Sequence, residues 1–584
     1  MSKIETLRKQ ILAQNPTDQQ TAAIFEDELE FLLRASPGSG KTWTSCRRFI
    51  WRGANWPYPS GGLALLSFTN TAIREFHDAT IKVGRRDLLS DPNYVGTFDS
   101  FVERFILTPF GHLIAGSSKR PKLFIAPRPG DRNNKKLMAW TEIKGRKQPV
   151  PAWDIIPYPE NGKYAYKAPK EFGGKRLLLA GQNPVHELMG AGLYTHQQRV
   201  YWACRLLFDR PHIAKLIARR FPEIVVDEAQ DTNVWLLILL NCVRENGSKV
   251  TLIGDPDQCI YEFSMAEPTS LPALKEKWGL PEKPLSQSFR CNNKIAAAVR
   301  NIGGNDAFVG CGEGNNQSHR PFIVRDTTDH FSHSIAKFEQ AVKSAEINKS
   351  SSAIICRAHQ QIEAIRGEVH YTKLKGMTKD LAMAAFLRDV RKDYKRASEI
   401  VEKVLRSIIE DHAFWERLDE SPDSDESRRI KVEIWRFVKL ESGLPSMNLK
   451  GGEWLLQLRQ GLGKLLASLG FKDVVNLAQK IRKTGLTDNQ LALPLFESQK
   501  LFPAIRQETI HKVKGESIDA VLVLGSVRFW NAVVDAISSG ASTEERRLAY
   551  VAMTRARHLL VVGLPAAHYD NHADKWMSWG FEVL

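Results

Sequence analysis

Residues 35–42 read ASPGSGKT and have the composition and spacing of a loop that binds phosphate. They follow the apolar residues Phe31, Leu32 and Leu33. The backbone N–H groups of such a loop, and the N-terminus of the helix behind it, surround the phosphates of a nucleotide. Lys41 is expected to reach the β- and γ-phosphates and the Thr42 hydroxyl to hold Mg²⁺; the alternative is a glycine-rich turn without a ligand. The residues predicted to cradle the phosphates are Ala35, Ser36, Pro37, Gly38, Ser39, Gly40, Lys41 and Thr42.

A pair of adjacent carboxylates follows a second apolar run. Residues 221–231 read FPEIVVDEAQD, which predicts a buried strand that ends at Asp227 and Glu228. Open α/β sheets hold their ligands at the carboxyl ends of their strands. We expect Asp227 to bind Mg²⁺ through its water shell and Glu228 to polarise the water that attacks the γ-phosphate. The loop and the carboxylate pair together predict an ATPase that requires Mg²⁺.

The two motifs are too far apart in the chain for one strand-and-helix repeat, so a segment is inserted between them. Within residues 119–147, lysines and arginines far outnumber acidic residues, and prolines and aromatic residues follow. This pattern predicts a basic subdomain carried on a nucleotide-binding core, although a solvated charged face would have the same composition. After Glu228 the alternation of strands and helices resumes. Residues 369–495 favour helices, and α/β patterning returns after residue 508.

The composition indicates a soluble protein with a polyanionic partner. The formal net charge is +16 and the pI is about 9.4, which favours nucleic acid as that partner. The 7 cysteines have no C-x-x-C spacing, so neither a zinc nor an iron–sulfur site is predicted. No apolar run approaches the ~20 residues that span a membrane, and the N-terminus is not a signal peptide. We expect a cytoplasmic location.

Seven further segments occur in an order that resembles the motifs of superfamily 1 helicases of the UvrD/Rep branch. They are residues 17–24 (TDQQTAAI), 65–76 (LLSFTNTAIREF), 96–101 (GTFDSF), 254–263 (GDPDQCIYEF), 287–290 (QSFR), 508–515 (ETIHKVKG) and 551–557 (VAMTRAR). The resemblance implies an α/β fold with two RecA-like parallel-sheet domains, each with an inserted, mainly helical subdomain. The implied boundaries are 1–104 with 186–285 for the first domain, 105–185 for its insertion, 286–362 with 500–584 for the second domain, and 363–499 for its insertion.

The resemblance also assigns residues around ATP. Gln20 would offer its amide to the adenine edge, and Phe289 would stack on the base. Arg290 and Arg555 match the arginine fingers of the family, and Gln258 matches a glutamine that couples hydrolysis to DNA. For a residue taken alone, a surface glutamine, a core phenylalanine or a surface ion pair would be the simpler interpretation. Trp43 stands where relatives often carry a basic residue, so base contact there could be stacking.

A second group of residues matches positions at which relatives contact single-stranded DNA. Stacking on aromatic faces tolerates any base sequence, as a translocating protein requires. Phe68, Tyr261, Phe263 and His511 match base contacts, and Asn70 and Thr97 match backbone contacts. Against this, an aromatic residue beside a strand is more often part of a core.

The resemblance implies an ATP-driven helicase that moves 3′ to 5′ on single-stranded DNA and opens tailed duplexes. The alternative is a DNA-activated ATPase that serves as a sensor or regulatory subunit of a nuclease complex. The segment KVKGES and the compact second insertion are also similar to small helicases of Gabija-type antiphage systems, which implies an OLD-family nuclease as a partner. An RNA helicase is disfavoured by the branch.

Overall fold

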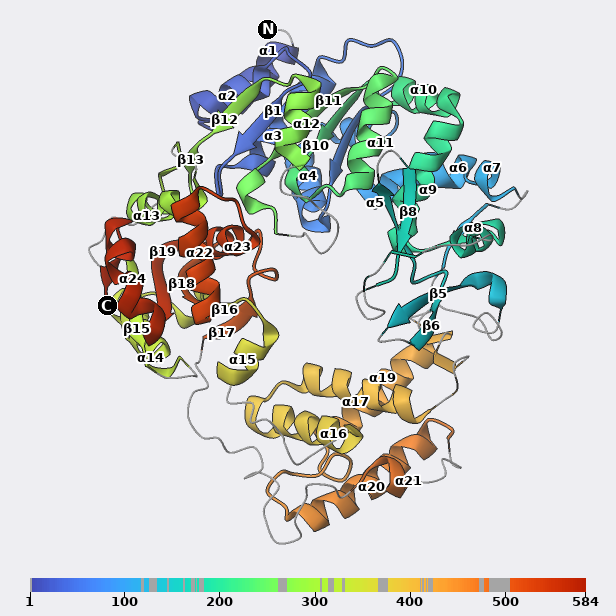
Figure 1. The fold of residues 1–584 in the computed structure, drawn as a ribbon, viewed down its shortest axis with the longest axis vertical. Helices are drawn as coiled ribbons and strands as arrows, with labels where there is room; N and C mark the ends of the chain where they lie inside the picture. Colours follow the sequence, from blue (N-terminus) through green and yellow to red (C-terminus); the bar gives the residue numbers. More distant parts are fainter. Residues whose placement is uncertain are drawn as a thin grey trace. The chain divides into compact units, whose positions relative to one another are not determined.

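The computed structural model divides the chain into two compact units, drawn in Figure 1. The first unit comprises Met1–Thr327, Ala336–Arg357 and Ile505–Leu584, and the second comprises Thr328–Ile335 and Ala358–Ala504. The structure describes residues 3–116, 120–124, 134–143, 146–160, 163–169, 174, 176–177, 183–260, 270–304, 307–312, 320–327, 331–365, 376–409, 411, 414–415, 417–418, 424–471, 477–482 and 505–584.

The first unit begins with a parallel sheet of six strands. In sheet order they are β12 (Glu282–Leu285), β1 (Leu32–Ala35), β11 (Lys249–Gly254), β10 (Glu223–Val226), β2 (Leu63–Ser67) and β3 (Tyr94–Thr97). Every residue of β2 and of β10 is buried, as expected for strands covered on both faces by helices. The helices around this sheet are α1 (Lys3–Leu12), α2 (Asp18–Phe25), α3 (Lys41–Ala54), α4 (Asn70–Lys82), α5 (Phe98–Val102), α9 (His196–Asp209), α10 (Pro211–Arg220), α11 (Val234–Glu245) and α12 (Ser270–Trp278), with short turns η1 (Arg86–Leu89), η6 (Ala229–Asp231) and η7 (Pro256–Gln258).

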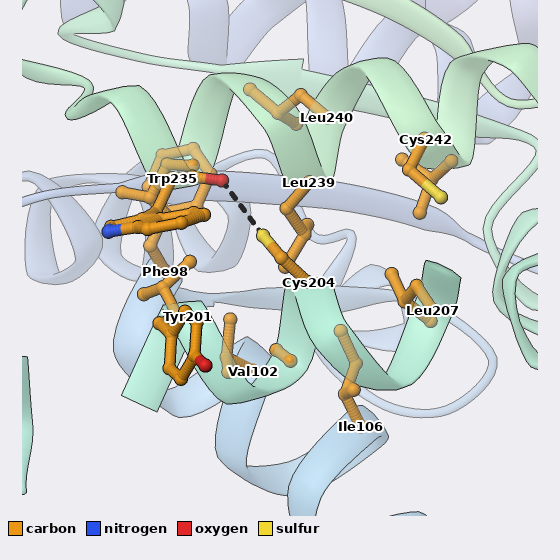
Figure 2. Packing of buried hydrophobic residues seen from close by; sticks show 14 of the residues in the cluster. Phe98, Val102, Ile106, Tyr201, Cys204, Leu207, Trp235, Leu239, Leu240 and Cys242 are labelled. Carbon is orange, nitrogen blue, oxygen red and sulfur yellow. Dashed lines mark hydrogen bonds between the residues drawn. The ribbon is translucent and has the colours of Figure 1, made fainter. Parts of the chain in front are cut away.

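One core of this domain is formed where α9 and α11 pack together with residues from α5. Figure 2 shows Tyr201 and Cys204 of α9 facing Trp235 of α11, with Phe98 beside them. The Sγ of Cys204 donates a hydrogen bond to the Trp235 carbonyl at 3.2 Å. A separate core on α1 to α4 includes Phe49. The 7 cysteines, which all lie in the described part of the chain, form no disulfide, and Cys311 is the exposed one among them.

A second parallel sheet of six strands completes the first unit. Its order is β17 (Arg506–Thr509), β16 (Ser352–Cys356), β18 (Ile518–Leu524), β19 (Ala556–Pro565), β15 (Pro321–Asp326) and β20 (Glu582–Val583), and β13 (Gln287–Ser288) pairs with β14 (Val309–Gly310) nearby. Its helices are α13 (Asn293–Gly303), α14 (Ser332–Ser344), η9 (Lys349–Ser351), α22 (Val527–Ser539), α23 (Glu544–Met553) and α24 (Ala566–Ser578). The predicted α/β class with two RecA-like parallel sheets is therefore confirmed.

The first insertion differs from the expected, mainly helical subdomain. The described elements in and directly beside residues 105–185 are η2 (Glu103–Leu107), α6 (Thr108–Phe110), α7 (His112–Ala115), β4 (Lys122–Leu123), η4 (Lys135–Leu137), β5 (Met138–Ile143), β6 (Arg146–Pro151), β7 (Ile156–Glu160), β8 (Lys163–Lys167), α8 (Pro184–Gly190) and β9 (Leu193–Tyr194). The pairs β5–β6 and β7–β8 are antiparallel hairpins. Prolines at 149, 151, 157 and 159 explain why this segment forms hairpins and not the expected helices, because proline interrupts a helix but is accommodated in an edge strand. Much of the basic stretch 119–147 lies outside the described residues, so its role stays a prediction.

The second unit is helical in its described part, as the pattern of residues 369–495 predicts. Its elements are α15 (His359–Ile365), α16 (Gly376–Phe386), η10 (Leu387–Arg391), α17 (Tyr394–Ile408), α19 (Asp425–Lys439), α20 (Gly451–Ser468) and α21 (Leu477–Lys480). Leu381, Val401, Ile434 and Trp454 meet in its core. The domain boundaries given by the resemblance stay predictions. In the described part of the chain, no helix is long and apolar enough to span a membrane.

Candidate nucleotide and nucleic-acid site

The phosphate-binding loop connects β1 to the N-terminus of α3 at the carboxyl end of the first sheet. The backbone N–H of Phe289 donates to the Gly38 carbonyl at 2.9 Å. At Gly38 the backbone φ is +74°, and an added Cβ would lie 2.5 Å from the Cβ of Arg290. Only glycine fits at this position, because the loop contacts the segment that enters the second core domain.

The two catalytic candidates of the first domain contact each other. The Nζ of Lys41 lies 2.8 Å from Oε2 of Glu228. Burial acts to lower the pKa of Lys41, but the charges of Glu228 and Asp227 outweigh it and raise this pKa. For Glu228, burial acts to raise the pKa, whereas the charges of Lys41 and Lys514 outweigh it and hold the pKa below its usual value. Both groups are therefore charged, and each depends on the other for compensation in a partly buried site.

The backbone at Glu228 has an unusual conformation. Its φ is 55°, in the left-handed region that residues with a side chain seldom occupy. Such a conformation costs roughly 1 kcal/mol and is common at functional sites. Gln230 is hydrogen-bonded to the Glu228 carboxylate through Nε2 and accepts from the Asp255 N–H at 3.0 Å through Oε1. The carboxylate is thus fixed between Lys41 and Gln230.

Asp227 has the properties of a magnesium ligand. It is fully buried, and neither carboxylate oxygen has a hydrogen-bond partner among the described residues. Burial, followed by the charge of Glu228, raises the pKa of Asp227 to about 7. Thr42 lies in the first turn of α3 and lines a cavity of about 2000 Å³ that Glu228 also lines. In the described ranges, no group of three His, Cys, Asp or Glu could hold a metal ion. Mg²⁺ keeps several waters and takes phosphate oxygens as ligands, so Thr42 and Asp227 would hold it together with a bound nucleotide.

Two arginines of the second domain reach the same cavity. Arg290 donates from Nε to Oγ of Ser517 at 2.8 Å and from a terminal nitrogen to the Thr554 carbonyl at 3.2 Å. Arg555 is fully buried and donates to Oε1 of Gln258 at 3.2 Å. Burial, followed by the charge of Arg290, lowers the pKa of Arg555 to about 9, which still leaves it protonated at neutral pH.

Gln258 connects the two domains. Besides accepting from Arg555, it donates through Nε2 to Oδ2 of Asp255 at 2.7 Å. Arg547 donates to the carbonyl of Cys259 at 2.7 Å, so the segment that follows Gln258 is also held by the second domain. A change at Gln258 would be transmitted directly to Arg555. This geometry is compatible with the coupling role assigned to Gln258, which stays a prediction.

The two residues predicted to contact adenine differ in their surroundings: the Gln20 amide is already hydrogen-bonded, whereas the Phe289 side chain is exposed. The amide of Gln20 already accepts from the Thr17 N–H and donates to the Ser39 carbonyl, both at 3.0 Å, so it ties the start of α2 to the phosphate loop. Phe289 is 50% exposed and lines the cavity, as a stacking residue should. The guanidinium of Arg47 lies 4.2 Å from the centre of the Trp43 ring. Base recognition by Gln20 and Phe289 stays a prediction.

One cavity of about 2000 Å³ extends from the phosphate loop to residues that are predicted to contact single-stranded DNA. Phe68 and Thr97 line it, and Phe68 also packs against Phe98 with ring centres 4.9 Å apart. His511 donates through Nε2 to the Ile260 carbonyl at 3.1 Å. Tyr261, Phe263 and the side chain of Asn70 lie outside the described residues. Contact with DNA therefore stays a prediction for all six residues.

The structure adds a polar contact that the sequence patterns did not single out. Lys514 forms an ion pair with Asp231, at 2.6 Å from Oδ1 and 2.7 Å from Oδ2. Both residues lie inside recognised segments, KVKG and DEAQD, so their positions were visible. Their pairing across the chain was not, because no local pattern connects the two segments.

Comparison with protein families places both sheets in one family. Residues 16–135 and 183–278 match the UvrD/REP helicase N-terminal domain, and residues 467–565 match the UvrD-like helicase C-terminal domain. The matched ranges include the phosphate loop, the carboxylate pair and Arg555.

Individual relatives are similar at low identity. DNA helicase II of Salmonella typhimurium is 25% identical over 294 residues, which cover 48% of this chain and 39% of that protein. The match therefore spans well under half of that relative. The ATP-dependent DNA helicase PcrA of Staphylococcus epidermidis is 21% identical over 94% of this chain and 83% of its own length. The ATP-dependent DNA helicase Rep of Buchnera aphidicola is 21% identical over 90% and 89%, respectively.

The unpaired burial of Asp227 leads to a stability prediction. Its folded pKa of about 7 lies above the ordinary aspartate pKa of 3.8, so the folded state binds more protons than the unfolded state. This contribution to stability is lost as pH rises from about 4 to about 7. Asp227→Asn should therefore stabilise the ligand-free protein at pH 8, by about 1 kcal/mol or more, and by less at pH 5.5. Thermal unfolding at the two pH values measures this.

Asp255 is the matched control. It is equally buried, and burial also raises its pKa to about 7, but its carboxylate accepts from the Asp257 N–H and from Gln258. Asp255→Asn should destabilise the protein because it disturbs these bonds. If Asp227→Asn lowered the melting temperature at pH 8 as much as Asp255→Asn does, Asp227 would not be an unpaired buried acid.

Proposed function

The chain belongs to the UvrD/REP helicase family, and on that premise we propose that it hydrolyses ATP to move 3′ to 5′ along single-stranded DNA and to open tailed duplexes. The observation that best supports this proposal is the convergence of charges on one cavity. Lys41 and Glu228 come from the first core domain, and Arg290 and Arg555 come from the second. Such an arrangement is suited to hydrolysis that depends on how the two domains meet.

Hydrolysis begins with an exchange of partners at Lys41. When ATP enters, its β- and γ-phosphates compete with Glu228 for the Lys41 ammonium. Glu228 is then released to orient a water molecule against the γ-phosphate and to accept its proton. Arg290 and Arg555 offset the negative charge that develops on the phosphate oxygens. Bound Mg²⁺, held by Thr42 and Asp227, would polarise the phosphate oxygens.

Single-stranded DNA is the proposed substrate of movement. The formal charge of +16 favours a polyanion, and the cavity that holds the phosphate loop continues to Phe68 and Thr97. Gln258 would relay the state of the nucleotide, since it contacts Arg555 and lies three residues before Tyr261. A partner nuclease of the OLD family rests on the sequence resemblance alone.

The catalytic assignment is tested by two substitutions. Glu228→Gln removes the proton acceptor but keeps the size of the side chain, so it should bind ATP and DNA while kcat falls by about a hundredfold or more. Lys41→Ala should weaken ATP binding as well as turnover. DNA-stimulated phosphate release and nucleotide titration separate the two effects.

Glu30→Gln is the control for Glu228→Gln, because Glu30 pairs with Arg244 and Lys249 outside the cavity. It should leave kcat unchanged. Turnover near that of the unsubstituted protein in Glu228→Gln would remove this carboxylate from the mechanism.

Polarity is tested with duplexes that carry a single-stranded tail at one end. A 3′ tail on the strand along which the protein moves should support ATP-dependent strand displacement, whereas a 5′ tail or a blunt duplex should not. Displacement from the 5′ tail would reverse the proposed direction. DNA-stimulated hydrolysis without displacement on any substrate would instead favour the regulatory ATPase, and the assay would then be repeated with an OLD-family nuclease.

A further inference from the structure

A buried ion pair joins the two core domains close to Glu228. Lys514 lies in the loop between β17 and β18 of the second sheet, and Asp231 ends η6, the turn that follows β10 of the first sheet. The Nζ of Lys514 is 2.6 and 2.7 Å from the two oxygens of Asp231. The side chains are only 10% and 8% exposed, so water screens their attraction weakly.

The loop that carries Lys514 also holds Arg290. Arg290 donates to the Gly515 carbonyl at 3.4 Å and to Oγ of Ser517 at 2.8 Å. A continuous set of contacts therefore runs from Asp231 through Lys514 and this loop to the guanidinium of Arg290. Asp231 is three residues from Glu228 in the chain, so the contacts begin and end at two groups that the proposed hydrolysis uses.

A buried ion pair is a poor way to gain stability, because desolvation of both charges offsets most of their attraction. It does define a geometry, since a displaced partner would leave an uncompensated charge in the interior. The neighbouring Lys512 shows the contrast. It is 66% exposed, and its partner Glu508 belongs to the same domain, so that pair cannot fix one domain against the other.

We propose that Lys514 is a positioning residue for Arg290: its ion pair with Asp231 fixes residues 514–517 against the first domain and thereby aims Arg290 at the γ-phosphate. This inference rests on the proposed ATPase activity. It predicts that loss of the pair affects the transition state, in which the arginine offsets developing charge, more than it affects the binding of ATP.

The test uses a variant in which both charges are removed, Asp231→Asn with Lys514→Met, because removal of one charge alone can unfold the protein. The kcat of DNA-stimulated ATP hydrolysis should fall by about tenfold or more, while the KM for ATP changes by less than about threefold. A preserved melting temperature shows that the variant is folded. Lys249→Met, which removes an exposed ion pair with Glu30 on the first domain, should leave kcat unchanged.

A double-mutant cycle identifies Arg290 as the group that is positioned. Arg290→Ala should cost much less in the uncharged background than in the unsubstituted protein, because the arginine is already misplaced there. The charge exchange Asp231→Lys with Lys514→Asp should recover part of kcat. The inference would be overturned if the folded, uncharged variant kept a kcat within twofold of the unsubstituted protein. It would also be overturned if Arg290→Ala lowered kcat by the same factor in the uncharged variant as in the unsubstituted protein. Absence of ATP hydrolysis by the unsubstituted protein would instead reject the proposed function, and this inference with it.

Discussion

The ion pair between Lys41 and Glu228 is the interaction on which the site depends. The Nζ of Lys41 and Oε2 of Glu228 are 2.8 Å apart in a partly buried position, where neither charge has enough water to compensate it. Each group therefore needs the other until phosphate arrives. In the proposed mechanism, an ATP molecule that pairs with Lys41 would also release Glu228, so substrate binding would itself free the carboxylate to orient a water molecule. The backbone of Glu228 is in the left-handed conformation, and its carboxylate is hydrogen-bonded to Gln230. Both features keep this carboxylate close to Lys41 and to the proposed position of the water.

The second domain is connected to this pair through polar contacts. Arg555 donates to Gln258, and Lys514 pairs with Asp231. Gln258 and Asp231 each lie in a short turn that follows a strand of the first sheet. Burial makes these contacts strong in the correct geometry and unfavourable in any other. A small movement of one domain would consequently alter the charges around the γ-phosphate. If DNA binds along the cavity as proposed, these contacts would provide a physical route by which DNA and ATP influence each other.

The sequence predicted the parts of the site that are local in the chain. The phosphate loop and the pair Asp227 and Glu228 were recognisable because each follows an apolar strand within a few residues. The two parallel sheets were expected from the resemblance to superfamily 1 helicase motifs. Contacts between distant segments could not be predicted, because the pairing of Lys514 with Asp231 depends on how the two sheets meet. The engagement of the Gln20 amide by Thr17 and Ser39 is likewise a property of the folded chain.

In the first insertion, the family resemblance led to a wrong expectation about secondary structure. The family resemblance favoured helices there, yet the prolines at 149, 151, 157 and 159 were visible in the sequence and favour the hairpins that the structure contains. In this segment the positions of the prolines predict the secondary structure better than the family resemblance does.

The exchange of partners at Lys41 is tested most directly by a crystal structure with Mg²⁺ and a non-hydrolysable ATP analogue. The account predicts that the Lys41 ammonium contacts the β- and γ-phosphates and that the Glu228 carboxylate has left it to face a water beside the γ-phosphorus. A complex in which the phosphates occupy the loop while Lys41 remains paired with Glu228 would contradict it.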